Sequence, residues 1–223
     1  MITEATMQVL KNFATINPNI VIEEGNMLQT ISEAKNVVSK SIVDVEFPKT
    51  FGIFDLNEFL AVLNLIDKPE LKFTDNYVTV CDSVGRTNIK YYYSDLDVLT
   101  RPTSKVIAPE GDVKFILDRE TLSKVRRAAG VLGHNEVSVS CIDNTVCLTV
   151  SDKSDSTSNA YSIAVDGTYN EEQFNFVFNI NNLKMIEGDY DVSISQKLIS
   201  HFVNRSSKIE YWVALEKTST YGE

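Results

Sequence analysis

The strongest chemical signal in this sequence is a group of basic side chains in one short segment. Arg119, Lys124, Arg126 and Arg127 follow Asp118, which can cap a helix running to about residue 132. At about 100° per residue, the apolar residues of this helix gather on one side, Lys124 and Arg127 project from the opposite side, and Arg126 and Arg119 lie on the flank. Such cations attract phosphates without reading bases. The segment predicts a sequence-independent nucleic-acid face, although a merely solvated helix face shows the same pattern.

Basic residues are scarcer in the other predicted helices. The first, residues 3–16, has Lys11 on its outer face among polar and acidic residues. The helix after Asp55 has no outward basic residue, and the helix predicted after Asn179 offers Lys184. The predicted phosphate-facing set is therefore heavier in the second half of the chain.

Enzyme motifs are missing from the sequence. It has no G-x-S-x-G, G-x-x-x-x-G-K-[ST], H-E-x-x-H or G-x-G-x-x-G pattern. His134 and His201 fit structural or surface roles. The cysteines lie in apolar alternating runs without C-x-x-C spacing, which predicts buried strand thiols; they are Cys81, Cys141 and Cys147. We expect no catalytic residue, no metal and no cofactor.

Bulk properties restrict the class of protein further. The chain has 223 residues, 43% hydrophobic content and a net charge of -10. An acidic chain does not coat nucleic acid with its whole surface, but it can carry one basic face. No apolar run approaches the roughly 18 to 20 residues of a membrane span, and the N-terminal segment has no signal-peptide pattern. We expect a cytosolic protein with no membrane partner.

Two stretches share one pattern, an extended apolar run that leads into a capped helix. In residues 51–66 the predicted N-cap is Asp55, and Glu58 completes a capping box. In residues 175–186 the predicted cap is Asn179. Hydrophobic staples are predicted at both starts, formed by Phe54 with Phe59 and by Phe178 with Leu183. The duplication indicates a two-fold repeat of the whole chain.

Each half repeats the same order of elements: helix, hairpin, strand, strand into capped helix, and three strands. The hairpins are expected around residues 24–26 and 143–144. Residues 98–112 break the periodicity with two prolines and a glycine, which predicts a linker between domains 1–97 and 113–223. Meanders and hairpins imply antiparallel sheets with helices on one face, an α+β fold.

Several blocks of this chain resemble one family. LKNFATIN at 10–17, FDLNEFLAVL at 54–63, FNFVFNINNLKM at 174–185 and YWVALE at 211–216 are similar to the DNA polymerase sliding clamps of myovirus-type tailed bacteriophages. The resemblance spans nearly the whole chain and is poorest between about residues 70 and 118.

The resemblance implies a DNA-clamp fold of two similar domains, each with an antiparallel sheet and two inner helices. It implies a homotrimeric ring that encircles duplex DNA in the infected bacterial host and tethers the DNA polymerase. It also implies an ATP-driven clamp loader and contacts with the transcription machinery as partners. Lys11, Lys124, Arg126, Arg127 and Lys184 would then face DNA. The alternative is an acidic, self-associating viral structural or assembly protein with no DNA role.

A partner-binding site is expected beside the linker. The apolar residues of this polar segment are Val106, Ile107 and Pro109, and they need either burial or a partner. In the resembled family the last strand lies near the partner pocket, which adds Leu215 as a candidate wall. The equal alternative is that these residues only pin the linker to the sheet. The resemblance to phage clamps also implies a second location for the polymerase tail, at a subunit junction.

Overall fold

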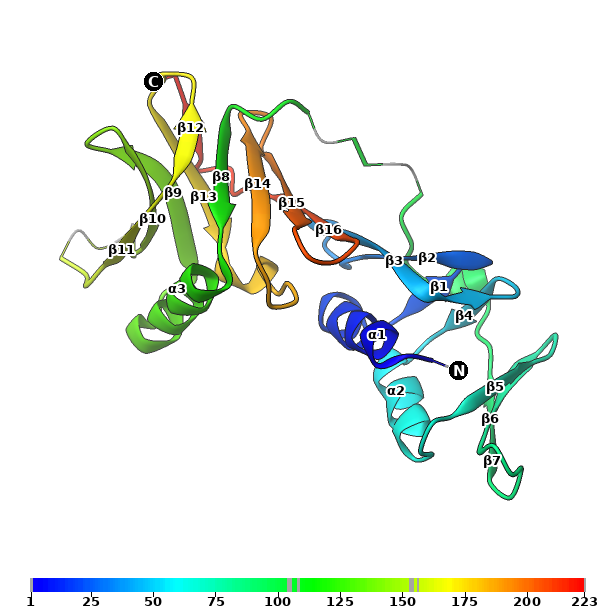
Figure 1. Cartoon of the computed structure of the whole chain (residues 1–223). Helices are drawn as coiled ribbons and strands as arrows, with labels where there is room; N and C mark the ends of the chain where they lie inside the picture. Colours follow the sequence, from blue (N-terminus) through cyan, green and yellow to red (C-terminus); the bar gives the residue numbers. More distant parts are fainter. Residues whose placement is uncertain (1, 104–105, 108, 153–154, 156, 223) are drawn as a thin grey trace. The chain divides into compact units, whose positions relative to one another are not determined.

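The computed structural model describes residues 2–103, 106–107, 109–152, 155 and 157–222 (Figure 1). The chain divides into two compact units, Met1–Lys105 and Val106–Glu223. Each unit combines helical segments with antiparallel strands. The predicted linker, residues 98–112, contains the border between the two units, and residues 104, 105 and 108 lie outside the described part of the chain.

Unit 1 begins with a helix, and its strands form small antiparallel groups: β1 with β4, β2 with β3, and a β5-β6-β7 sheet. Its elements in chain order are α1 (Glu4–Ile16), β1 (Ile20–Ile22), β2 (Gly25–Ile31), β3 (Val37–Phe47), β4 (Phe51–Ile53), α2 (Leu56–Asn64), β5 (Glu70–Phe73), β6 (Tyr77–Cys81), β7 (Asn88–Tyr92) and the 3₁₀ turn η1 (Leu96–Val98).

The start of α1 is fixed by hydroxyl and carboxylate groups. Thr3 is the N-cap and accepts from the backbone N–H of Thr6 at 3.1 Å. Asp44 of β3 accepts from the hydroxyls of Thr3 and Thr6 at 2.7 and 2.9 Å, and these bonds lower the pKa of Asp44. Leu10 and Phe13 are fully buried. The predicted first helix is confirmed.

The hairpin predicted around residues 24–26 is wrong. β1 pairs with β4, and β2 pairs with β3. The reason lies in the burial patterns. β1 is buried at all three positions and so is β4, whereas β2 and β3 bury only alternate residues over most of their length. Continuous burial suits β1 and β4 to a pair inside the protein, and alternating burial suits β2 and β3 to a sheet with one solvated face.

The capped helix predicted after Asp55 is confirmed as α2. The Asp55 carboxylate accepts from the Glu58 backbone N–H at 2.9 Å. The predicted staple is wrong, because Phe54 is 63% exposed while Phe59 is 1% exposed. Tyr91 of β7 packs against Phe59 instead, with ring centroids 5.1 Å apart, and its hydroxyl donates to the Asp55 carbonyl at 3.1 Å.

Unit 2 contains two antiparallel groups of strands, in the orders β11-β10-β9-β13-β17 and β12-β8-β14-β15-β16. Its elements are β8 (Val113–Leu117), α3 (Arg119–Leu132), β9 (Glu136–Ile142), β10 (Thr145–Val150), β11 (Tyr161–Val165), β12 (Gly167–Tyr169), β13 (Phe174–Asn179), the 3₁₀ turn η2 (Ile180–Asn182), β14 (Tyr190–Ser195), β15 (Ile199–Asn204), β16 (Ile209–Ala214) and β17 (Thr220–Tyr221).

Most sequence expectations for unit 2 are confirmed. α3 packs on β9, β10 and β11. The β9–β10 hairpin turns at Asp143 and Asn144, both with positive φ, as a two-residue hairpin turn requires.

All three cysteines of the chain are free. Cys81 of unit 1 and Cys147 of unit 2 are buried as predicted, but Cys141 is only half-buried, and its Sγ lies 3.1 Å from the Tyr169 hydroxyl.

One expected element does not form. After Asn179 the chain makes only η2, a three-residue 3₁₀ turn, so the second α-helix predicted for this half is wrong. Phe178 and Leu183, the predicted staple pair, are both buried, but Leu183 follows the turn instead of lying within a helix. Consecutive asparagines at 181 and 182 favour turns over helix interiors. In the described part of the chain, no helix combines the length and apolar character needed to cross a membrane.

Candidate nucleic-acid interface

Helix α3 is oriented by its cap, its end and its buried side. The Asp118 carboxylate accepts from the backbone N–H of Thr121 at 2.7 Å, and Gly133, with φ +70°, ends the helix. Leu122, Val125 and Ala129 are buried, as predicted. Because these three residues lie on one side, the opposite side of α3 faces solvent.

Two predicted cations lie on that solvent-facing side. Lys124 and Arg127 are both exposed. The Lys124 Nζ lies 2.7 Å from Glu120 Oε1 one turn earlier, and this hydrogen bond raises the pKa of Lys124. Arg127 has no ion-pair partner among the described residues. Arg127 is therefore the cation of α3 most available to an external anion.

The N-terminal end of α3 carries both signs of charge. Arg119 pairs with Glu187, and its backbone N–H donates to the Asp189 carboxylate at 2.8 Å. A hollow of about 570 Å³ lies here. Its lining residues are Asp118, Arg119, Glu120, Ser123, Lys124, Arg127 and Asp189. Acidic neighbours moderate the attraction of this surface for phosphate.

Arg126 is placed differently from its prediction. Its Nη2 donates to the carbonyls of Leu183 and, at 3.2 Å, Met185. Its guanidinium is half-buried, and burial lowers its pKa. The sequence pattern placed Arg126 on the helix flank but could not show that it turns toward the chain after η2. Arg126 therefore holds the segment after η2 and does not project from the basic side of α3, so its predicted DNA-facing position is wrong.

The remaining two predicted cations are both exposed. Lys11 lies on α1 of unit 1, as expected. Lys184 follows η2 and is not part of a helix, because the helix expected there is absent. Its predicted place on a helix face is therefore wrong, although its exposure is as predicted.

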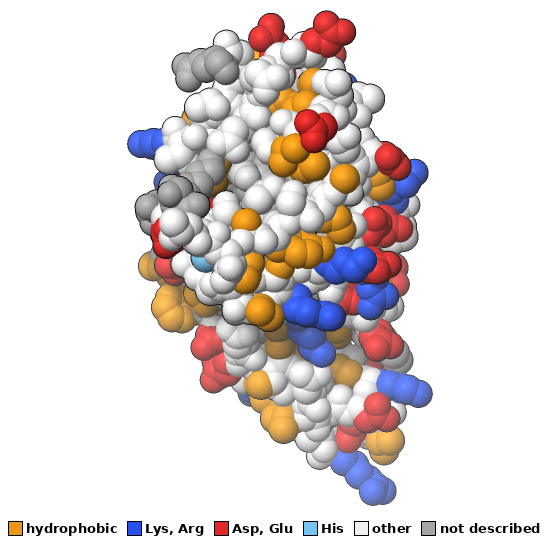
Figure 2. Space-filling view, turned by 90° about the vertical axis from the view of Figure 1, so that its left-hand side faces the viewer, with side chains coloured by type: hydrophobic (Ala, Val, Ile, Leu, Met, Phe, Trp, Pro, Cys, Tyr) orange, Lys and Arg blue, Asp and Glu red, His pale blue; other side chains and the backbone are white. Residues whose placement is uncertain are grey.

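Apolar residues border the basic side of α3, a feature that sequence reasoning missed. Val131 is 79% exposed at the end of α3. A shallow hollow of about 470 Å³ joins Val131 to Lys124, Arg127 and Tyr161 of β11. Figure 2 shows this side of the chain, with Lys and Arg side chains gathered beside apolar ones. The exposed position of Val131 opposite the buried stripe was readable from the helix period.

The predicted partner-binding residues divide into two kinds. Ile107 is 79% exposed, so it does not pin the linker to a sheet, and Val106 and Pro109 are half-buried. Leu215 is buried, at 7% exposure, and its N–H bonds to the Leu198 carbonyl at 3.0 Å. Leu215 belongs to the core of unit 2, so it is not a free surface for a peptide.

The charge of α3 contrasts with that of the chain. Its sequence, RETLSKVRRAAGVL, contains four cations and one acid, whereas the whole chain has a net charge of -10. α1 holds one lysine and one glutamate, and α2 holds one glutamate and no cation. The basic side of α3 can therefore offer electrostatic attraction to phosphates. Separately, no cluster of side chains able to hold a metal ion occurs among the described residues.

Comparison with known proteins connects this geometry to a family. A family model described as "DNA polymerase processivity factor" matches residues 3–98, and one described as "gp45 sliding clamp, C terminal" matches residues 114–217. A sliding clamp of Vibrio phage KVP40 is 32% identical over 220 residues, which cover 96% of this chain and 98% of that protein. This chain belongs to the sliding clamp family.

Further relatives and solved structures agree with this placement. The sliding clamp of Escherichia phage RB69 is 25% identical to this clamp and covers 99% of it and 98% of its own length. A solved complex described as the C-terminal region of FEN-1 bound to A. fulgidus PCNA has a TM-score of 0.71 at 15% identity, covering 96% of each chain. PCNA from Entamoeba histolytica has a TM-score of 0.68 at 14% identity, covering 94% of each. These structures show the clamp fold.

Membership of the family decides between the functions considered from sequence. The clamp is a DNA polymerase processivity factor and is not an enzyme. The alternative of a viral structural protein without a DNA role is wrong. The predicted resemblance to phage clamps and the predicted α+β clamp fold are confirmed.

Proposed function

We propose that three copies of this clamp form a ring around duplex DNA and that α3 of each copy faces the phosphates. The observation that carries this assignment is the pattern of α3. It buries one apolar side, exposes Lys124 and Arg127 on the other, and is basic within an acidic chain. Modest, sequence-independent attraction suits a protein that must surround DNA and still slide.

The assembly requires further partners in this proposal. A head-to-tail contact between identical chains closes into a ring when its rotation permits. A closed ring cannot thread onto circular or long DNA, so an ATP-driven clamp loader opens and places it. The clamp then acts in the cytoplasm of the infected bacterial host and holds the polymerase on its template.

Charge reversal tests the DNA face. We expect Lys124→Glu with Arg127→Glu to reduce polymerase processivity on primed DNA while the fold is kept, because both side chains point away from the core. The deficit should deepen with added salt in the range where counterion release weakens phosphate contacts.

The matched control reverses two other exposed cations of the same unit, Lys208 and Lys217, which lie outside α3. Sedimentation of both variants checks that assembly is unchanged. Normal processivity of the α3 variant at every salt concentration would show that DNA contacts another surface.

Solution mass tests the ring. A 25.0 kDa chain should sediment as a trimer over a wide concentration series. A monomer at micromolar concentration would refute the trimer without affecting family membership.

Ile107 provides the test of the polymerase-docking site. Because its side chain is 79% exposed, we propose that it contacts a C-terminal peptide of the polymerase. Ile107→Glu should weaken the binding of that peptide in titration calorimetry, whereas Ile142→Glu, another exposed isoleucine of unit 2, should not. Equal peptide affinity of wild type and the Ile107 variant would move the docking site elsewhere.

A further inference from the structure

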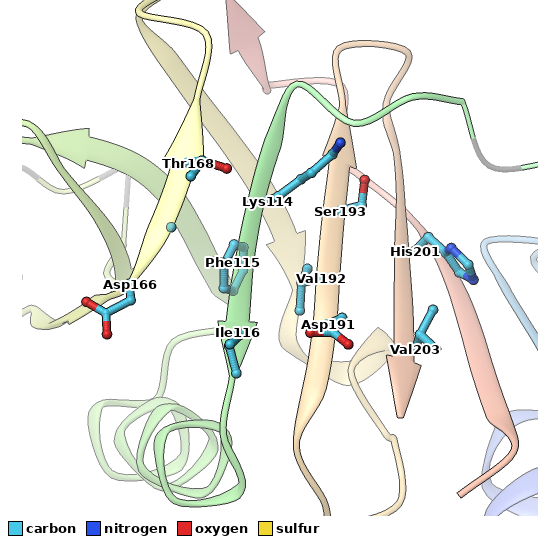
Figure 3. A pocket seen from close by; sticks show the side chains of 11 residues that line it. Lys114, Phe115, Ile116, Asp166, Thr168, Asp191, Val192, Ser193, His201 and Val203 are labelled. Atoms are coloured by element: carbon cyan, nitrogen blue, oxygen red, sulfur yellow. The ribbon is translucent and has the colours of Figure 1, made fainter. Parts of the chain in front are cut away.

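The outward face of β12, β8, β14 and β15 carries a hollow of about 560 Å³, whose lining includes neither the α3 cations nor Ile107 (Figure 3). Side chains reach it from two cross-strand rows that the register fixes. Thr168 lies opposite Lys114, Lys114 opposite Ser193, and Ser193 opposite His201. The second row lies two residues away from the first on the same face of β8, β14 and β15, and places Ile116 opposite Asp191 and Asp191 opposite Val203.

The first row presents hydrogen-bond donors. The Lys114 ammonium and the hydroxyls of Thr168 and Ser193 make no hydrogen bond or ion pair with other described residues. In Figure 3 the Lys114 side chain extends toward Ser193, with Thr168 on its other side. A cation with two hydroxyls beside it suits a carboxylate, which accepts several hydrogen bonds.

The second row presents aliphatic side chains where a solvated sheet face usually has polar ones. Ile116 is 42% exposed and Val203 is half-buried. Asp191 lies between them, and its carboxylate is 3.6 Å from Arg205 Nε. This row therefore offers apolar contact area on either side of an exposed acid that faces Arg205.

A firm wall closes the row of donors on the β15 side. The His201 ring stacks on Trp212 of β16 with centroids 4.7 Å apart and planes at 8°. His201 Nε2 also lies 2.9 Å from Glu210 Oε2. These contacts hold the imidazole in place, so it forms one side of the hollow.

The spacing of the two rows defines what fits. Lys114 and Ile116 are two residues apart on one face of β8, about 6.6 Å along the strand. An extended peptide has the same two-residue repeat. If it lies along β8, one of its side chains falls over Lys114 and the next on that face falls over Ile116.

We infer that this hollow is a docking site for an extended segment of a partner protein, in which an acidic residue and a large apolar residue stand two positions apart. The acidic side chain meets Lys114, Thr168 and Ser193, and the apolar side chain covers Ile116 and Val203. Asp166 lies at the β12 margin of the hollow (Figure 3) and disfavours a second acid there. The site is separate from the proposed DNA face and from Ile107.

Three labelled nine-residue peptides test this inference by fluorescence anisotropy with the intact clamp. The first has one Glu and one Phe two positions apart in a Ser/Thr background. The second replaces the Glu by Lys, and the third moves the Glu to three positions from the Phe. We expect the wild type to bind the first peptide about tenfold more tightly than either of the others, the scale of one ion pair.

Three variants identify the surface. Lys114→Glu should reverse the preference toward the Lys peptide, and Ile116→Thr, which keeps a β-branched residue in the strand, should weaken binding of the first peptide severalfold. Lys208→Glu, another exposed lysine of unit 2, should change nothing.

Absent binding up to millimolar peptide, equal affinity for the three peptides, or an unchanged preference in Lys114→Glu would each overturn the inference. None of these readouts depends on ring formation or processivity, so failure of the proposed function would appear separately in sedimentation and primed-DNA synthesis.

Discussion

The two strand-and-cap segments of this chain start from one sequence pattern and reach different structures. In unit 1, β4 leads into Asp55 and the nine-residue helix α2. In unit 2, β13 leads into Asn179 and the three-residue turn η2. Both caps accept a bond from a nearby backbone N–H, Asp55 from Glu58 and Asn179 from Asn181. The cap therefore starts a turn but does not decide whether a helix follows.

Residues downstream of the cap decide the outcome in unit 1. The sequence of α2, LNEFLAVLN, is dominated by strong helix formers, and four of its apolar residues are buried. Helices of this length gain most of their stability from packing. The apolar period of α2 therefore supplies what the cap alone does not.

In unit 2, side chains from other elements form hydrogen bonds with the backbone groups that follow the cap. Arg126 donates to the Leu183 and Met185 carbonyls. The Ile186 backbone N–H donates to the Tyr211 hydroxyl at 3.2 Å, and the Tyr190 hydroxyl donates to the Ile186 carbonyl. Backbone groups that a helix would satisfy internally are satisfied externally here. The comparison shows that a cap motif predicts the position of a turn, while tertiary partners select its form.

The largest expected effect concerns the packing of the first segment. Phe59→Ala should lower the free energy of unfolding by about 3 to 5 kcal/mol, because Phe59 is 1% exposed beside Tyr91. The matched control is Phe54→Ala, which removes a ring that is 63% exposed and should change stability by about 0.5 kcal/mol or less. Urea denaturation followed by circular dichroism measures both. Similar losses for the two variants would restore the staple that the structure rejects.

A smaller effect concerns the external donor of the second segment. Arg126→Met should cost about 1 to 3 kcal/mol, because two backbone carbonyls lose their donor. The matched control is the neighbouring Arg127→Met, which should leave stability unchanged, because Arg127 is exposed. The order of the two variants should be the opposite in DNA assays. Arg127→Met should reduce processivity at raised salt, and Arg126→Met should not alter its salt dependence; the reverse result would return Arg126 to the DNA face.

Most of the fold could be predicted from the hydrophobic periodicity and the helix-cap patterns of the sequence. The strands of the β5-β6-β7 meander, helix α1 and the capped α3 followed from local patterns that burial then reinforced. Strand pairing was less accessible. The run at 20–22 has the same local appearance whether it pairs with β2 or with β4, and only the burial of both its faces selects β4.

Exposure of the basic helix face was readable in the same way, because Lys124 and Arg127 follow from helical period alone. The position of Arg126 was not readable, since its partners are carbonyls 57 and 59 residues away. The hollow on the β8 face was also missed, because it requires the register of four strands.

The smallest expected effect compares the two caps directly. Asp55→Ala should cost about 0.5 to 2 kcal/mol of unfolding free energy, because the first turn of α2 loses its acceptor. Asn179→Ala should cost about 0.5 kcal/mol or less, because η2 is one short turn and the Ile180 N–H is already bonded to the Asn135 carbonyl at 2.8 Å. Paired urea titrations measure the difference. If Asn179→Ala costs as much as Asp55→Ala, the segment after β13 depends on its cap, and its external hydrogen-bond partners Arg126 and Tyr211 are not what holds it in place.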